Sequence, residues 1–376
     1  MKMFKGVVGA MAAAGILALL AGCGGSSTDT SVIGQVLDSR SNPIAGATVT
    51  VVSPVAGPTA KTDADGRFAL KGMPAGQTVI IRCTKEGYVP DLSYPVPVIE
   101  TQDSETKLTL IKVGTSQTVD TTTDNVVTHT RSDGIKASVH IAANSIVDTS
   151  GQPVASAVVD VTVIPIKPNA EECREAQIAT RAAGDEKPGA LLTTPAVAVE
   201  VRDAAGKDLK LDPMKPATIE FPVAADNDPG TSTTGLWAQK PLPELWVKEG
   251  DVTRDDTVNP PVYRAKVTHF SQFVSGTRAD YPYTLVVQTM NNPSIPDNVM
   301  VPGAYVKAVD LTNGIVQVGT TGASGAVLFA MPGKKYTIRA SKLGYTDRGV
   351  YSTQWVGNIA NVVYWLQKIK TGGAGS

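Results

Sequence analysis

The sequence predicts an all-β protein made of three β-sandwich domains in series. The chain is rich in Thr, Val, Ala, Gly and Pro, contains only 6 Phe in 376 residues, and shows no helical heptads. Short strand-like segments alternate with clusters of turn residues at close intervals, which is typical of a sandwich. The 354 residues that follow the first 22 (376 − 22) can form about two to four domains of roughly 100 to 200 residues each.

The N-terminus has the layout of a cleaved secretory signal. A basic start precedes an apolar run over residues 6–20, the small pair Ala21-Gly22, then Cys23 and a polar tether that extends to residue 30. The segment resembles a bacterial lipoprotein signal, which implies that residues 1–22 are removed. The alternative is an uncleaved membrane anchor, but about 15 apolar residues are short for a span of roughly 20.

The resemblance also implies where the mature protein resides. Cys23 would carry the lipid, such as palmitate, as the new N-terminus. Gly24 follows it where lipoproteins retained in the inner membrane have Asp. We therefore expect a protein anchored by lipid in the outer membrane, on either its periplasmic or its surface face.

The first domain is expected over residues 31–113. Its strands are predicted at residues 32–36, 47–51, 67–70, 78–82 and 107–111. Turn clusters separate them at residues 38–43, 62–66, 73–76 and 85–88.

Five motifs in this domain occur in order and at normal spacing. They are Gly34-x-Val36, Pro43-Ile44-Ala45-Gly46-Ala47-Thr48-Val49, Asp63-Ala64-Asp65-Gly66-Arg67-Phe68, Pro74-Ala75-Gly76 and Lys85-x-Gly87-Tyr88. Together they resemble the carboxypeptidase regulatory-like domain, which implies a seven-stranded, transthyretin-like sandwich. That domain accompanies zinc carboxypeptidases without supplying their metal site. The peptidase itself needs a His-x-x-Glu pair, and none of the three His of this chain has Glu three residues later.

A different β-sandwich domain is expected over residues 114–280. Its strands are predicted at residues 134–141, 158–166, 197–201, 217–223, 245–247 and 264–271. Their order resembles the β-sandwich of ankyrins and netrin receptors, which closes on a His-Phe-Ser strand. Residues 167–193 depart from that pattern and are expected to form a helical or loose insertion.

Residues 281–370 repeat the pattern of the first domain. The segments that begin at Gly303, Thr321, Met331 and Lys342 match those at Gly46, Asp63, Met73 and Lys85. We therefore expect a second, diverged carboxypeptidase regulatory-like domain, followed by a flexible tail at residues 371–376. The domain breaks fall near residues 114 and 280, and the domains are expected to be separable.

Two cysteines remain besides Cys23. In an oxidising periplasm Cys83 and Cys173 could pair, or each could be a separate buried thiol. Cys173 lies in the one helix-like stretch, at residues 170–180, and the spacing does not decide between the two alternatives.

The turn that begins Asp63-x-Asp65-Gly66 could start a calcium loop. A helix-flanked loop of this kind needs a third acidic position and a distal Glu, which are missing. We expect an Asp-rich turn with Gly66 at positive φ and no metal site.

Aromatic side chains near the C-terminus offer a candidate carbohydrate site. Tyr351, Trp355 and Trp365 are the candidate ligand-binding residues, because exposed rings stack on sugars. Alternation along the last strand sends Tyr364 to one face and Trp365 to the other, so one ring faces outward or into an interface. Alternatively, these aromatic rings pack in a core or between domains. Trp237 and Trp246 are likewise expected to pack in a core.

The segment His269-Phe270-Ser271 offers a second, catalytic alternative. On a strand, residues two apart share a face, so His269 could act as base for the Ser271 hydroxyl and cleave the Phe270–Ser271 bond. The same residues serve equally well as an ordinary final strand, with Phe270 in the core and His269 paired.

The sequence points to a non-enzymatic envelope protein. No nucleophile elbow, phosphate-binding loop or metal cluster is present, so we expect no cofactor. The 34 basic and 35 acidic residues leave a net charge of −1, which gives no reason to expect nucleic acid as a partner. We expect a lipid-anchored binding, adhesion or scaffolding module that contacts the membrane through Cys23 and an unidentified envelope protein or polysaccharide. Self-cleavage at Phe270–Ser271 and carbohydrate binding are the two alternatives.

Overall fold

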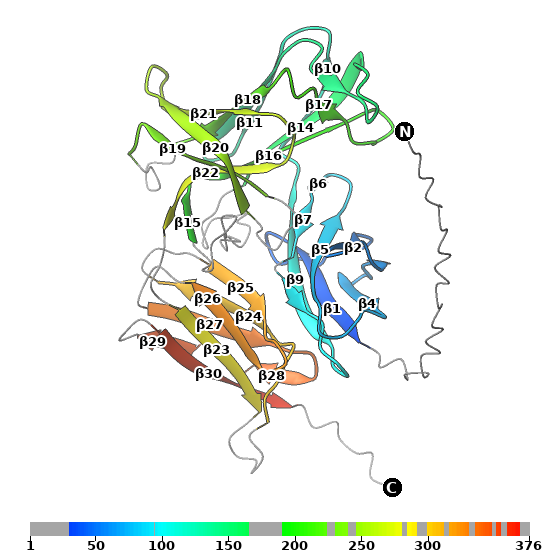
Figure 1. Cartoon of the computed structure of the whole chain (residues 1–376), viewed down its shortest axis with the longest axis vertical. Coiled ribbons are helices and arrows are strands. Elements are labelled where there is room, and N and C mark those ends of the chain that lie inside the picture. The colour runs from blue at the N-terminus through cyan, green and yellow to red at the C-terminus, as the bar shows by residue number, and fades with distance from the viewer. Residues whose placement is uncertain are drawn as a thin grey trace, which may run out of the picture.

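The structure is a computed structural model that describes eleven stretches of the chain. They are residues 30–93, 95–164, 190–223, 230–239, 246–279, 284–291, 299–311, 316–330, 335–347, 351–354 and 359–368. All regular elements in these stretches are strands, which confirms the all-β class (Figure 1). No helix in this part of the chain is long and apolar enough to cross a membrane. The signal with Cys23, Cys173 with its helix-like stretch, Trp355 and the tail lie outside the described residues.

The N-terminal part forms two sheets packed face to face. The strands are β1 (Ser31–Asp38), β2 (Thr48–Ser53), β3 (Thr59–Lys61), β4 (Arg67–Lys71), β5 (Thr78–Thr84), β6 (Tyr88–Val89), β7 (Asp91–Leu92), β8 (Val96–Pro97) and β9 (Ser104–Lys112). One sheet has the order β4-β1-β9-β6, and the other has β3-β2-β5-β7 with β8 also paired to β5. Strand β4 alternates exposed and buried residues, so Phe68 and Leu70 enter the core between the sheets.

The C-terminal part has the same topology. Its strands are β23 (Thr284–Asn291), β24 (Tyr305–Asp310), β25 (Val316–Thr320), β26 (Ala326–Ala330), β27 (Lys335–Ser341), β28 (Tyr345–Asp347), β29 (Tyr351–Gln354) and β30 (Ile359–Lys368). The sheet orders are β26-β23-β30-β28 and β25-β24-β27-β29, and β23 runs parallel to β30 as β1 does to β9.

Two local structural features occur at corresponding positions in the N-terminal and C-terminal parts. Gly66 and Gly325 have φ of 71° and 68°, and their carbonyls accept the amides of Val36 and Thr289, each at 2.8 Å. The positive φ predicted for Gly66 is confirmed. The turn favours glycine because residues with a side chain rarely adopt a positive φ.

The second feature is a buried threonine hydroxyl. Thr62 Oγ1 accepts the Ala47 amide at 2.8 Å, and Thr321 Oγ1 accepts the Ala304 amide at 2.9 Å. Both threonines are buried, so each hydroxyl satisfies a backbone group that would otherwise be costly to bury. The motif comparison included Thr321 in a matched turn but did not predict this role for either hydroxyl.

The central part is a single 11-stranded sheet folded over one core. Its strands are β10 (Thr115–Asp120), β11 (Asn125–Thr130), β12 (Lys136–Ile141), β14 (Ser156–Ile164), β15 (Ala190–Thr193), β16 (Ala196–Arg202), β18 (Ala217–Pro222), β19 (Thr233–Gln239), β20 (Trp246–Asp255), β21 (Val262–Val267) and β22 (Gln272–Ala279). A separate small pair joins β13 (Ile146–Val147) to β17 (Lys210–Leu211). The folded sheet forms two layers. Strand β20 connects them, because it pairs with β19 over most of its length and with β21 at its end.

Two sequence expectations for this part are corrected. The strand expected at residues 264–271 ends at Val267, and β22 starts at Gln272, because the chain here crosses from the layer of β21 to the layer of β22. The segment at residues 190–193, expected in the insertion, is strand β15 and pairs with β22.

The three parts meet at a shared apolar cluster, here called the junction cluster. It contains Ile80, Val89, Leu92 and Ile111 of the N-terminal part, Ile164, Ala196, Ala198, Trp237, Trp246 and Val274 of the central part, and Tyr305, Val316 and Val318 of the C-terminal part. Each part also has a core of its own. Trp237 and Trp246 are buried as expected, but they face the junction cluster and not the central core.

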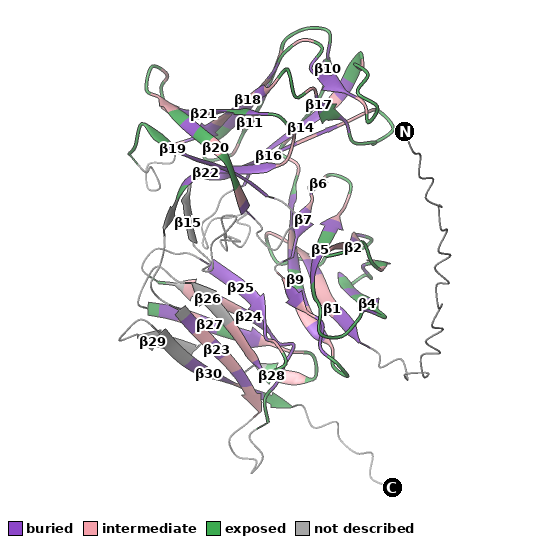
Figure 2. Cartoon of the chain, viewed as in Figure 1, coloured by how far each residue is buried: buried purple, intermediate pink, exposed green. Residues whose placement is uncertain are grey.

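Strand β25 shows how closely the parts fit. It lies at the edge of its sheet, yet all five of its residues are buried (Figure 2). Val316 and Val318 enter the junction cluster, and the Thr320 hydroxyl donates to the Glu105 carbonyl at 2.6 Å. The N-terminal part therefore covers a strand edge that would otherwise be open to pairing with another chain.

Polar contacts reinforce this interface between the two terminal sandwiches. Across the interface, the Lys342 ammonium donates to the Asp103 carbonyl at 2.7 Å, and the Leu343 amide donates to the Glu105 carboxylate. Within the C-terminal part, Lys342 also donates to the Pro302 carbonyl at 2.6 Å. Burial lowers the pKa of Lys342 and raises the pKa of Glu105. The two charges lie close enough to offset part of each other's desolvation.

Candidate functional site

A groove of about 1120 Å³ lies between the N-terminal and central parts. We call it the inter-domain groove. One wall comes from the end of β5 and the turn after it, and the other comes from β14, β16 and the turn after β16. The sequence did not predict it, because it is formed by residues far apart along the chain.

Strand alternation sets which side chains reach the groove. Val159, Val161 and Val199 lie in the central core. Their neighbours Asp160 and Glu200 lie directly opposite each other on β14 and β16 and line the groove. Opposite residues of an antiparallel pair share a face with Cβ atoms about 4.5–5.5 Å apart, so the two carboxyl groups form a pair.

Asp160 is the most deeply placed charge of the groove. The residue is only 2% exposed, and its Oδ2 forms an ion pair with the Arg202 guanidinium. Its other oxygen, Oδ1, is buried and has no hydrogen-bond partner among the described residues. A buried carboxylate oxygen without a donor is costly, so this atom is poised to accept a hydrogen bond.

Glu200 is a titratable group near neutral pH. Its pKa is raised to about 7, chiefly by burial; Asp160 and Asp208 act in the same direction, while Arg82 and Arg202 act in the opposite direction. A carboxyl group in this state changes charge within the physiological range.

The groove as a whole is acidic and polar. Its lining carries the carboxylates of Glu86, Asp160, Glu200, Asp203 and Asp208 against the cations of Arg82, Lys85 and Arg202. The Gln272 amide group, which also lines the groove, donates to the Pro90 carbonyl at 2.7 Å and thus links the two walls. The two parts of the chain are therefore joined at the groove itself.

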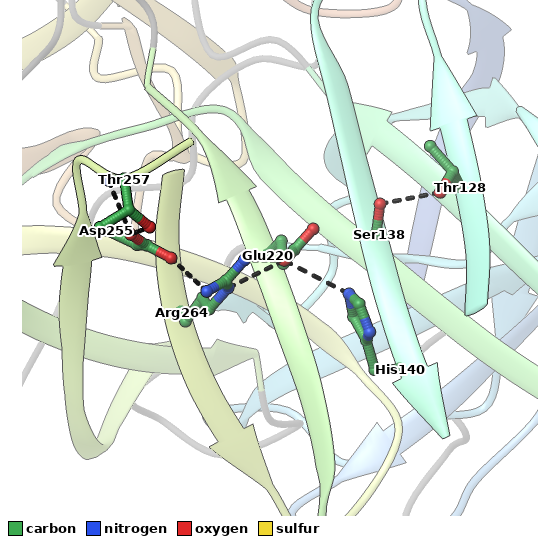
Figure 3. Close-up of polar contacts among 7 residues, drawn as sticks. All are labelled: Thr128, Ser138, His140, Glu220, Asp255, Thr257 and Arg264. Carbon is green, nitrogen blue, oxygen red and sulfur yellow. Dashed lines mark hydrogen bonds and ion pairs between the residues drawn. The ribbon is translucent and has the colours of Figure 1, made fainter. Parts of the chain in front are cut away.

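A second polar cluster lies on the outer face of the central sandwich (Figure 3). Glu220 on β18 contacts the imidazole of His140 at 3.3 Å and the guanidinium of Arg264 at 2.8 Å, and Arg264 also pairs with Asp255. Thr257 donates its amide to Asp255 at 2.9 Å. The charges of this cluster are paired with one another, so it is a surface network on the sheet and not a ligand site.

The residues considered for self-cleavage lie between β21 and β22. The His269 Nε2 atom is 2.8 Å from the Glu249 carboxylate, and the Ser271 hydroxyl donates to the Gln239 carbonyl at 3.0 Å. The structure thus places the imidazole and the hydroxyl against different partners. Phe270 packs against the central core.

The aromatic candidates are only partly described. On β30, Tyr364 is buried and Trp365 is partly exposed, as alternation predicted. Tyr351 lies on β29, and its side chain, like all of Trp355, is outside the described part. The structure therefore leaves Trp365 as the described aromatic of this group with access to solvent.

The acidic turn of the N-terminal part is held by its own backbone. Asp63 Oδ1 accepts the amides of Asp65 at 3.0 Å and Arg67 at 2.8 Å. The described residues contain no group of three His, Cys, Asp or Glu that could hold a metal ion. Cys83 is buried in the N-terminal core, and Cys173 lies outside the described residues, so the structure does not decide between a pair and two separate thiols.

Comparison with protein families matches residues 31–111 to the carboxypeptidase regulatory-like domain. This confirms the resemblance that the five motifs predicted for that segment. Comparison with curated proteins found no match.

Solved structures give matches of low similarity. The Bacillus anthracis TIE protein is 13% identical with a TM-score of 0.20, and the match covers 91% of this chain and 51% of that one. This chain thus spans about half the length of the TIE protein. The major pilin subunit BcpA of Bacillus cereus is 9% identical (TM-score 0.20; 91% and 100% covered), and the major pilin SpaD of Corynebacterium diphtheriae is 10% identical (TM-score 0.20; 91% and 98% covered). Similarity at this level says nothing about the function of this chain.

Proposed function

We propose that this chain is a lipid-anchored protein of the bacterial outer membrane that acts as a binding, adhesion or scaffolding module and has no enzymatic activity. The observation that carries the proposal is the junction cluster, which joins the three all-β parts and holds a polar groove between the N-terminal and central parts. A preformed groove held by a rigid frame is suited to recognition, because little conformational entropy is lost when a ligand binds.

The position of the groove fits attachment at the N-terminus. Strand β1 begins at Ser31, next to the start of β9, since Val32 pairs with Ser104. Val113, just beyond the other end of β9, lines the groove. At about 3.3 Å per residue, β9 separates these points by roughly 30 Å. Strand β1, which follows the tether, therefore begins at the end of the N-terminal sandwich opposite the groove, and this supports attachment through Cys23 with the groove left accessible.

Lipidation is expected at Cys23. Intact mass spectrometry of the membrane-extracted protein should show a chain that begins at diacylated or triacylated Cys23. The Cys23→Ala variant should be released from the membrane or keep its signal, whereas Cys173→Ala should stay anchored, because only Cys23 follows the signal. Recovery of an unmodified chain that begins at Met1 from the membrane fraction would contradict this part of the proposal.

A carbohydrate ligand is a second candidate, favoured by one observation. Trp365 is partly exposed on β30, next to the buried Tyr364. Exposed indole rings stack on sugar faces. Binding of the wild-type protein on a glycan array, lost in Trp365→Ala, would support it. Self-cleavage at Phe270–Ser271 is not part of the proposal, because His269 and Ser271 contact other groups.

A further inference from the structure

We propose that the inter-domain groove binds a primary ammonium group, carried by the lysine side chain of an extended peptide segment of a partner protein, with Asp160 and Glu200 as its acceptors. The inference deepens the proposed binding role by naming the class of ligand. It does not depend on the lipid anchor, so the two can fail separately.

The first argument is the free acceptor. Asp160 is almost fully buried, its Oδ2 is used by Arg202, and its Oδ1 has no described donor although the residue lines the groove. An ammonium group has three N–H donors and no acceptor, so it supplies the missing bond together with a compensating charge.

The second argument is the pairing of two carboxyl groups. Glu200 lies opposite Asp160 in the register of β14 and β16, within reach of the same ligand atom. A single cation between the two relieves their mutual repulsion. The charges around Glu200 come from every wall: Arg82 on β5, Asp160 on β14, Arg202 on β16 and Asp208 in the turn that follows. Carboxylates outnumber cations along the whole lining, which favours a cationic ligand over an anionic one.

The third argument is size. A small amine occupies only a fraction of about 1120 Å³. Pockets for single small molecules range from about 300 to 1,000 Å³, so this open groove suits a longer ligand. A divalent cation is disfavoured, since no described group of three acidic or His ligands could hold one.

Binding should depend on pH in a defined direction. An ammonium group binds the ionised form of Glu200, so binding favours loss of the Glu200 proton. Since the pKa of Glu200 is about 7, the affinity should rise from pH 6 to pH 8 and level off above. A lysine ammonium stays charged throughout, so one titrating carboxyl group predicts a rise of about tenfold.

The test uses calorimetry of the purified full chain with the probe acetyl-Ala-Ala-Lys-Ala-Ala-amide. A second peptide has norleucine in place of lysine, and cadaverine serves as a free amine. We expect the lysine peptide to bind, the norleucine peptide to bind at least about tenfold more weakly, and the affinity to rise with pH. Equal affinity for cadaverine would support ammonium recognition and assign a small amine as its source.

Variants locate the site. Asp160→Asn should weaken binding by about tenfold or more, because it removes a charged acceptor. Glu200→Gln should lower the affinity at pH 8 and abolish the pH dependence of binding. This variant leaves the Asp160–Arg202 pair intact, so the test remains valid even if Asp160→Asn misfolds. Glu100→Gln is the control, because Glu100 is exposed and lies outside the groove. Equal binding of the norleucine peptide, displacement of the lysine peptide by Ca²⁺, or unchanged binding in folded Glu200→Gln would overturn the proposal.

Discussion

Replacement of Trp237 by alanine is expected to lower the free energy of unfolding by about 3–5 kcal/mol, as for other buried aromatic side chains. The indole is 4% exposed, lies in the junction cluster, and donates its Nε1 hydrogen to the Gly276 carbonyl at 3.0 Å. Its loss leaves a cavity where the three parts of the chain meet. Urea denaturation followed by circular dichroism measures the effect.

Trp365→Ala is the matched control for this substitution. The same ring is removed from a partly exposed position on β30, where we expect a cost of about 1 kcal/mol or less. Equal effects of the two variants would show that the junction cluster contributes no more than an ordinary surface contact.

Gly303→Ala should be the second strongly destabilising change. Gly303 has φ of 71°, and an added Cβ would lie 2.4 Å from the Asp103 carbonyl and 2.9 Å from the Lys342 ammonium. The substitution therefore adds backbone strain and pushes the terminal sandwiches apart. We expect a total cost of about 3 kcal/mol, measured by the same unfolding experiment.

Gly344→Ala separates the two causes. Gly344 has a similar φ of 81°, but its added Cβ would meet no described atom within 4 Å. Only the strain remains, which costs about 1 kcal/mol. If both glycine variants lose the same stability, the contact between the terminal sandwiches does not restrain the fold.

Strand periodicity and turn glycines made much of the fold predictable. Alternation correctly separated Tyr364 from Trp365, and the motif spacing pointed to the match between the terminal parts that the strand orders now display. These features are local, because a residue's direction on a strand depends on the pleat alone. The turn at Gly66 was also predictable, because its conformation depends on the local sequence.

The junction and the groove could not be predicted in this way. Ile80 and Ile111 lie in predicted strands, but only the packing of the three parts brings them into a shared cluster. Asp160 and Glu200 occupy outward positions of their strands, which in an isolated sandwich would be a solvated face. Their burial results from the N-terminal part that covers them, and this long-range contact has no signature in the local sequence.

Scanning calorimetry of the full chain most directly tests the central claim, that the three parts form one cooperative body and not the separable domains that the sequence predicts. The shared junction cluster predicts a single transition whose calorimetric and van't Hoff enthalpies agree, and Trp237→Ala should split or broaden it. Two or three resolved transitions in the wild-type protein, unchanged by Trp237→Ala, would show instead that the parts unfold independently and that no rigid frame holds the groove.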